Sequence, residues 1–235
     1  MRYKNSLLVV LVCLLSLWPI AAPAGAQTEQ KPTVKIPEPG VPEIMTMEGR
    51  FVRAAYNNEG YVILGYRVAN DSVGEEWMLL EIGVTVMDHV PDYTLKRDAI
   101  SLTTPDGTKV PLATAEEHRK ANLRALEGRA NAVRDSINYF PPARDACRLG
   151  FFADPSSRLM PWDEVGLTST RACMGRLYFK VPGGIQYGQH WLDVKFEKSL
   201  VRVPFRILTK EEYKFLDKNF KDISKQVEEA FRKKS

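Results

Sequence analysis

Two neighbouring segments with period-two alternation constrain this chain most. Residues 61–69 and 77–86 are each long enough for a strand, and the segment 70–74 between them reads Asn-Asp-Ser-Val-Gly, which is typical of turns. Apolar side chains occupy every second position of both segments, while Glu81 and Thr85 face away from the apolar set. The pattern predicts an antiparallel hairpin with one face pressed on a core.

Further short alternating segments continue the same pattern along the chain. The turn Pro105-Asp106-Gly107 separates two of them, and Pro204 in the last one favours a strand at a sheet edge. Many short strands with turn signals between them predict a mainly-β chain, an immunoglobulin-like antiparallel β-sandwich spanning residues 45–208. The additional predicted strands are 47–56, 98–103, 109–112, 176–181, 190–196 and 200–208.

The N-terminus has the pattern of a secretory signal peptide. A short basic start is followed by an apolar run over residues 6–20, which is shorter than the roughly 20 residues of a membrane span. Small residues then lead to Ala26, so we expect cleavage near that residue and a signal peptide over 1–26. The mature chain is therefore expected to be exported, periplasmic or extracellular, with no transmembrane span after cleavage.

The mature chain has little net charge and begins with a spacer. Removal of residues 1–26 takes away Arg2 and Lys4 and no acidic residue, so the formal charge falls from +4 to +2. This balance gives no electrostatic reason to expect nucleic acid as a partner. Residues 27–44 are rich in proline and predict an extended, semi-rigid spacer.

Two cysteines remain after cleavage, Cys147 and Cys173. An even number of cysteines in an exported chain favours a disulfide, and the spacing differs from that of a redox-active C-x-x-C pair. We expect this bond to tie down residues 139–174, a segment rich in Pro, Ser, Asp and Arg that otherwise reads as a long irregular loop beneath the first helix.

Two amphipathic helices are predicted, over 114–138 and 209–235. Thr114 with Glu117, and Thr209 with Glu212, have the spacing of capping boxes, and apolar residues then recur at intervals of three and four. We expect the C-terminal helix to bury its stripe on its own domain, against the stripe of Leu123 to Ile137, which favours a monomer. Pairing with the same helix of a second copy stays an alternative.

Two strand and turn motifs resemble those of a known group of domains. Residues 102–107, Leu-Thr-Thr-Pro-Asp-Gly, and residues 175–182, Gly-Arg-Leu-Tyr-Phe-Lys-Val-Pro, resemble stretches of bacterial secreted immunoglobulin-like domains of the telokin-like kind. The resemblance covers roughly residues 47–208, apart from the helix and the cysteine loop. It implies a sandwich fold and a location in the cell envelope, and it implies no functional residues.

Catalytic motifs are absent from the sequence. The three histidines, His89, His118 and His190, belong to no zinc-protease pattern, and no nucleophile elbow, phosphate-binding loop or dinucleotide glycine pattern occurs. His118 lies in the first turns of the predicted helix 114–138, where we expect it to be solvated. A hydrolase whose catalytic residues keep no fixed spacing remains an alternative.

Copper binding is the sharper alternative. Met45 and Met47 form an M-x-M pair, and Met87 and His89 follow the central hairpin. Thioether and imidazole groups are ligands that select Cu(I). The bland interpretation is that these side chains pack in the fold or lie on its surface.

The predicted helix 114–138 also has a basic face. Acidic residues on the same helix offset part of its charge, which is typical of a solvated face. An anionic partner, such as lipid headgroups or an acidic protein, is the functional alternative. The basic residues are Arg119, Lys120, Arg124, Arg129 and Arg134.

Together these patterns favour a non-catalytic exported binding or assembly module of the cell envelope. Its expected partner is another envelope protein or a surface component. No catalytic residue, cofactor-binding residue or cofactor is predicted.

Overall fold

The computed structural model describes residues 44–153 and 160–232, and its central element is a six-stranded sheet with the order β1-β2-β3-β4-β10-β8. Neighbouring strands are antiparallel, apart from β8 and β10, which run parallel. The strands of this sheet are β1 (Ile44–Gly49), β2 (Val52–Tyr56), β3 (Gly60–Gly65), β4 (Trp77–Val86), β10 (Arg171–Lys180) and β8 (Asp145–Arg148).

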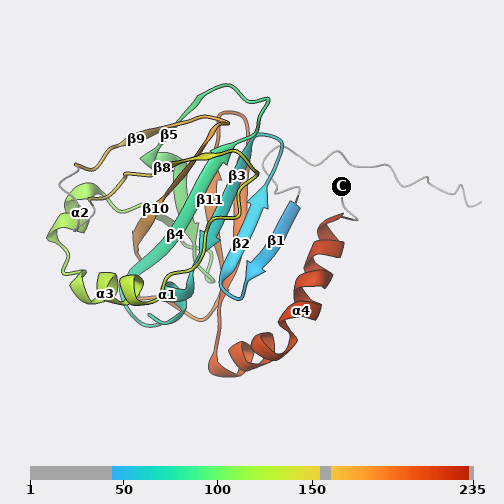
Figure 1. Cartoon of the computed structure of the whole chain (residues 1–235). Coiled ribbons are helices and arrows are strands. Elements are labelled where there is room, and N and C mark those ends of the chain that lie inside the picture. The colour runs from blue at the N-terminus through green and yellow to red at the C-terminus, as the bar shows by residue number, and fades with distance from the viewer. Residues whose placement is uncertain (1–43, 154–159, 233–235) are drawn as a thin grey trace, which may run out of the picture. The chain divides into compact units, whose positions relative to one another are not determined.

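A second, four-stranded antiparallel sheet has the order β12-β11-β6-β7, and β5 pairs with β9 in a small ribbon. The prediction of a mainly-β chain with packed antiparallel sheets and a C-terminal helix is confirmed (Figure 1). The remaining elements are β5 (Tyr93–Lys96), η1 (Arg97–Ala99), β6 (Ile100–Thr103), β7 (Lys109–Pro111), β9 (Glu164–Leu167), β11 (Gly188–Lys195), β12 (Leu200–Ile207), α1 (Arg67–Asn70), α2 (Ala115–Lys120), α3 (Arg124–Ala132) and α4 (Lys210–Arg232).

The core fills the space between the two sheets. Leu80 and Ile82 of β4 and Leu192 of β11 are fully buried in one apolar cluster. Phe196 packs so closely on β3 that its ring lies 2.1 Å from where a Cβ on Gly60 would stand, so only glycine fits there. β12 forms one edge of the smaller sheet, as Pro204 predicts.

The opposite, outer face of the six-stranded sheet is covered by residues 133–140, which we call the strap. Ile137 and Phe140 of the strap pack on a second small apolar cluster that contains Ile63. Gly83 makes this approach possible, because a Cβ there would stand 2.4 Å from the Phe140 ring. β3 is therefore buried on both faces, whereas the alternation alone indicates one apolar face.

The predicted strand over 61–69 ends earlier than expected. β3 stops at Gly65, and α1 follows before β4 begins. The backbone N–H of Arg67 donates to Asp135 Oδ2 of the strap at 3.0 Å, so a side chain takes the donor that a continuing strand would use. The hairpin pairing of β3 with β4 is nevertheless confirmed.

The predicted strand over 47–56 is instead a hairpin of β1 and β2. Arg53 stabilises its turn by donating from Nη1 to the carbonyl oxygens of Gly49, at 2.9 Å, and Arg50, at 3.3 Å. β1 begins at Ile44, the last residue of the predicted spacer. The predicted signal peptide 1–26 and the rest of the spacer lie outside the described residues.

The predicted single helix over 114–138 is wrong. The Thr114 capping box is present, but α2 ends at Lys120, and the following Ala121 is extended, with a ψ of 143°. α3 ends at Ala132, and the strap begins at Val133, where φ is −134°. Packing of the strap on the sheet overrides the helical periodicity, because it buries Ile137 on β-strands instead of on a helix partner.

The predicted irregular loop over 139–174 contains β8, β9 and the start of β10. The predicted disulfide between Cys147 and Cys173 is confirmed. It joins two register partners on neighbouring strands of the sheet, rather than clipping a loop beneath a helix.

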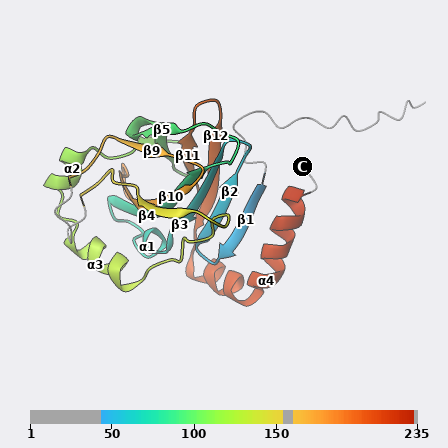
Figure 2. The ribbon, with the colours of Figure 1, turned by 45° about the horizontal axis from the view of Figure 1, so that its top comes forward.

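The C-terminal helix α4 lies along β1, and not against residues 123–137 as predicted (Figure 1). The ring of Tyr213 stacks on Phe51 with centroids 5.7 Å apart, and Asp217 pairs with Arg50 at 2.5 Å. Figure 2 shows the helix beside the same edge strand from a second direction. The expectation that it docks on its own domain is met at a different surface.

Candidate functional site

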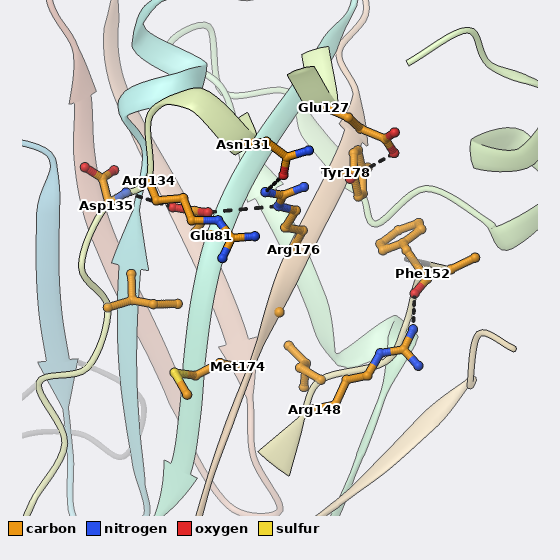
Figure 3. Close-up of a pocket in the computed structure, with 14 residues that line it drawn as sticks. Glu81, Glu127, Asn131, Arg134, Asp135, Arg148, Phe152, Met174, Arg176 and Tyr178 are labelled. Carbon is orange, nitrogen blue, oxygen red and sulfur yellow. Dashed lines mark hydrogen bonds and ion pairs between the residues drawn. The ribbon is translucent and has the colours of Figure 1, made fainter. Parts of the chain in front are cut away.

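A cavity of about 810 Å³ opens on the outer face of the six-stranded sheet, and we call it the outer groove (Figure 3). Its floor consists of side chains that point outward from β4 and β10. α3 and the strap form two sides, and residues 148–153 form another. The floor residues are Glu81, Met174, Arg176 and Tyr178.

Strand register creates the charge pair on the floor. Glu81 of β4 lies directly opposite Arg176 of β10, and the two charged groups are 3.9 Å apart. Arg176 also donates from Nη2 to Asn131 Oδ1 of α3 at 2.8 Å. One guanidinium therefore links both floor strands to the helix above them.

The strap brings a second carboxylate to the groove. The backbone N–H of Asp135 donates to Glu81 Oε2 at 3.0 Å, while Asp135 itself accepts from the backbone N–H of Arg67. Burial raises the pKa of both Glu81 and Asp135, although these backbone hydrogen bonds oppose the shift. Both carboxylates thus accept hydrogen bonds from the protein's own backbone.

Arg148 stands at the other end of the groove and is held from several sides. It is the last residue of β8, next to the disulfide at Cys147. Its Nη2 donates to Phe152 O at 2.9 Å, and its guanidinium lies 5.6 Å from the Trp162 ring. Among the described residues, Nη1 is buried without an acceptor and no carboxylate lies within 4 Å of the guanidinium.

A partly buried histidine adjoins the groove. His118 packs between Phe152 and Tyr178, with ring centroids 4.9 and 4.4 Å away, so the expectation that it is solvated is wrong. Its Nε2 lies 3.8 Å from Glu127 Oε1 and has no hydrogen-bond partner within the part of the chain that the structure describes. Burial, and then the positive charge of Arg97, lower the pKa of His118.

The copper hypothesis finds its four residues in two separate places. Met45 and Met47 are buried side chains of the edge strand β1. Met87 and His89 follow β4, three strands away in the same sheet. At roughly 4.8 Å per strand this is about 14 Å, so the two pairs do not meet in one site.

The predicted basic helix face is divided. Lys120 pairs with Glu116 at 2.6 Å and Arg129 pairs with Glu75 at 2.5 Å, while Arg119 and Arg124 are exposed. Arg134 leaves this face altogether, because it belongs to the strap and lines the outer groove. In Figure 3 its guanidinium lies over Glu81 and beside Arg176.

Sequence reasoning missed the outer groove. The alternation does place Glu81 opposite the apolar face of its strand, and Arg176 has the same character within β10. What the sequence does not give is the path of the strap, which brings Arg134 and Asp135 to those side chains. An acidic and a basic residue on the non-core faces of two apolar strands are the signal that was available.

Comparison of the chain with protein-family models, with curated proteins and with solved structures gives no match. Across residues 44–153 and 160–232, no helix has the length and hydrophobicity needed to cross a membrane. In the same part of the chain, no three His, Cys, Asp or Glu side chains are grouped as a metal site.

Proposed function

We propose that this protein is an exported, non-catalytic binding or assembly module of the cell envelope and that the outer groove is its ligand site. The observation that carries the proposal is the groove itself, with a volume of about 810 Å³, within the range of small-molecule sites. Its lining combines apolar side chains with three arginines that come from three different segments. Such a mixture is typical of a site that orients a ligand.

The chemistry of the lining favours binding over catalysis. The described residues that line the groove include no Ser, Thr, Cys or His, so they do not supply a Ser, Thr or Cys nucleophile with a histidine base. The bond between Cys147 and Cys173 supports the proposed export, since structural disulfides persist in oxidising compartments.

Native mass spectrometry of protein purified from its own envelope fraction tests the proposal. Met174→Trp fills the floor of the groove without changing charge, and Thr103→Trp on β6 of the other sheet is the matched control. We expect a small-molecule adduct on the wild type and on Thr103→Trp, and none on Met174→Trp. An adduct that Met174→Trp retains, or no adduct on any of the three proteins, would contradict the proposal.

A hydrolase is the second candidate, because one observation favours it. Glu81 and Asp135 are neighbouring carboxyl groups with raised pKa values in a cavity, which is a feature of acid–base sites. Their backbone hydrogen bonds give the simpler explanation that they fix the strap. Glu81→Gln separates the two: it abolishes turnover of envelope glycans or esters if Glu81 is a general acid, and it only loosens the strap if binding is the function.

A further inference from the structure

We infer that the ligand of the outer groove is a small amphipathic anion, with a carboxylate or phosphate head and a hydrocarbon body of small-molecule size. This inference rests on the proposed function, since it names the ligand class of that same site. The argument comes from how the charges of the groove are partnered, from its apolar lining and from the rigidity of Arg148.

The three carboxylates of the groove are partnered within the protein. Glu81 accepts from the backbone of Asp135 and faces Arg176, and Asp135 accepts from the backbone of Arg67. Glu127 accepts from the hydroxyl of Tyr178 at 3.4 Å. Each of these acids therefore has a partner within the protein, and these contacts hold the walls of the groove together.

The arginines have donors that the protein leaves unused. A guanidinium carries five N–H donors. Among the described residues, Arg148 has one hydrogen-bond acceptor, Phe152 O, and no carboxylate within 4 Å, while Arg134 lies over Glu81 without an ion pair shorter than 4 Å. The groove thus offers a ligand positive charge and guanidinium N–H donors. Carboxylates and phosphates have the geometry to accept from a guanidinium.

The apolar part of the lining indicates the chemistry of the ligand beyond its anionic head. Leu149 and Phe152 are buried next to Arg148, and Met174 of β10 is its register partner. Ile137 of the strap adds apolar surface on another side. An anion seated at Arg148 therefore has apolar side chains within reach for a hydrocarbon body, and the volume of the groove limits that body to small-molecule size.

The fold holds Arg148 in place before any ligand arrives. The disulfide and the pairing of β8 with β10 fix its backbone, while Phe152 O and the Trp162 ring hold its guanidinium. A flexible arginine loses rotamer entropy on binding, and a restrained one has already lost it. This arrangement favours recognition of an anion, because binding need not order Arg148 first.

Isothermal titration calorimetry of the mature chain with four decyl compounds, all below their critical micelle concentrations, tests the inference. The probes are decanoate, decyl phosphate, decyl maltoside and decyltrimethylammonium, and acetate and inorganic phosphate report on the head alone. We expect decanoate, decyl phosphate or both to bind, with the preferred probe identifying the head, and no binding of the neutral or cationic compound. The heads alone should bind at least tenfold more weakly.

Variants locate the binding. Arg134→Gln with Arg148→Gln should weaken binding of the anion at least tenfold, while Arg119→Gln with Arg124→Gln removes the same charge from α2 and α3 outside the groove and should change it less than twofold. Arg134→Glu alone keeps the test valid if the double variant unfolds, because Arg134 is exposed; it should also weaken binding at least tenfold.

Several results would overturn the inference while leaving the groove as a binding site. They are tighter binding of the neutral or cationic decyl compound, equal weakening by the control variant, or binding of a short peptide acid such as acetyl-Ala-Ala-Leu without binding of either decyl anion. The proposed function fails on a different measurement, the adduct on protein from the native envelope, so the two failures are distinguishable.

Discussion

The two faces of the six-stranded sheet use the same strands for opposite purposes. Toward the second sheet, β4 presents Leu80 and Ile82, both fully buried in the main core. On the outer face, Glu81 between them in sequence and Gly83 after them meet the strap. Neighbouring side chains of one strand thus face opposite sides, one a sealed apolar interface and the other a partly open, charged groove.

This difference shows which face of the sheet has room for a ligand site. The inner face is closed by a complete sheet, so its side chains are fixed by mutual packing. The outer face is closed by single segments of chain, and their polar contacts leave a cavity between them. We therefore expect changes on the inner face to act on global stability, and changes on the outer face to act locally and on ligand binding.

Removing an inner-face aromatic ring should give the largest effect. Phe196→Ala empties the space above Gly60 and should lower the free energy of unfolding by about 3–5 kcal/mol, as expected for a fully buried phenylalanine. Urea unfolding followed by tryptophan fluorescence measures it. Tyr139→Ala, at an exposed ring, is the control and should change stability by less than about 0.5 kcal/mol. A loss below about 1 kcal/mol for Phe196→Ala would show that this ring does not seal the inner face.

Removing the disulfide should affect both faces. Cys147→Ala with Cys173→Ala opens a link across 26 residues and should lower the free energy of unfolding by about 3–4 kcal/mol in the chain-entropy model. Because Arg148 follows Cys147, ligand affinity should fall as well, whereas Phe196→Ala should leave it unchanged in the folded protein. Reductant should reproduce the effect in the wild type and have none in the double variant. Unchanged affinity in the double variant would contradict a role of the bond in holding the groove.

The contrast between the faces also explains what the sequence predicts. Period-two alternation is a local signal, so β4, β10, β11 and β12 follow from it. The disulfide follows from cysteine count and compartment, and both capping boxes follow from residue spacing. Each of these inferences depends on residues close in sequence or on a single pairing.

The outer groove depends on contacts that no local pattern encodes. The segment 114–138 has helical periodicity throughout, yet its last part becomes the strap, because Ile137 and Phe140 fit over Gly83 and Asp135 binds the backbone of Arg67. The sequence predicts that His118 is solvated, because no nearby residue indicates its contacts with the rings of Tyr178 and Phe152. Tertiary contacts thus override helix propensity in the strap, and in α2 they cover a side chain that the local pattern places in solvent.

Loosening the strap should affect the outer face alone. Phe140 is half-buried, so Phe140→Ala should lower the free energy of unfolding by only about 1 kcal/mol. Hydrogen exchange should nevertheless accelerate at the amides of Arg67 and Asp135, which the strap protects, while the amides of β11 should keep their rates. Equal acceleration in β11 would mean that the two faces unfold as one unit.

Mild acid should produce the smallest effect, and it compares one histidine from each side of the sheet. His190 is buried against Phe205 on the inner side, and His118 lies beside the outer groove. Burial lowers the pKa of both, so the unfolded chain binds more protons than the folded chain below about pH 6.5, and stability must fall as pH falls through that window. Glu81 and Asp135, whose pKa values burial raises, act in the opposite sense, so the share of the histidines is the part of the pH dependence that their substitution removes. The groups around His118 make its share separable: the positive charge of Arg97 opposes protonation, while Glu127 at 3.8 Å offers the imidazolium a partner. We expect His118→Gln and His190→Gln each to flatten part of the pH dependence in urea unfolding, and the double variant to flatten it most.

Only His118→Gln should also remove a pH dependence of ligand affinity, because only His118 touches residues of the groove. Loss of that dependence in His190→Gln would show that the two faces are coupled.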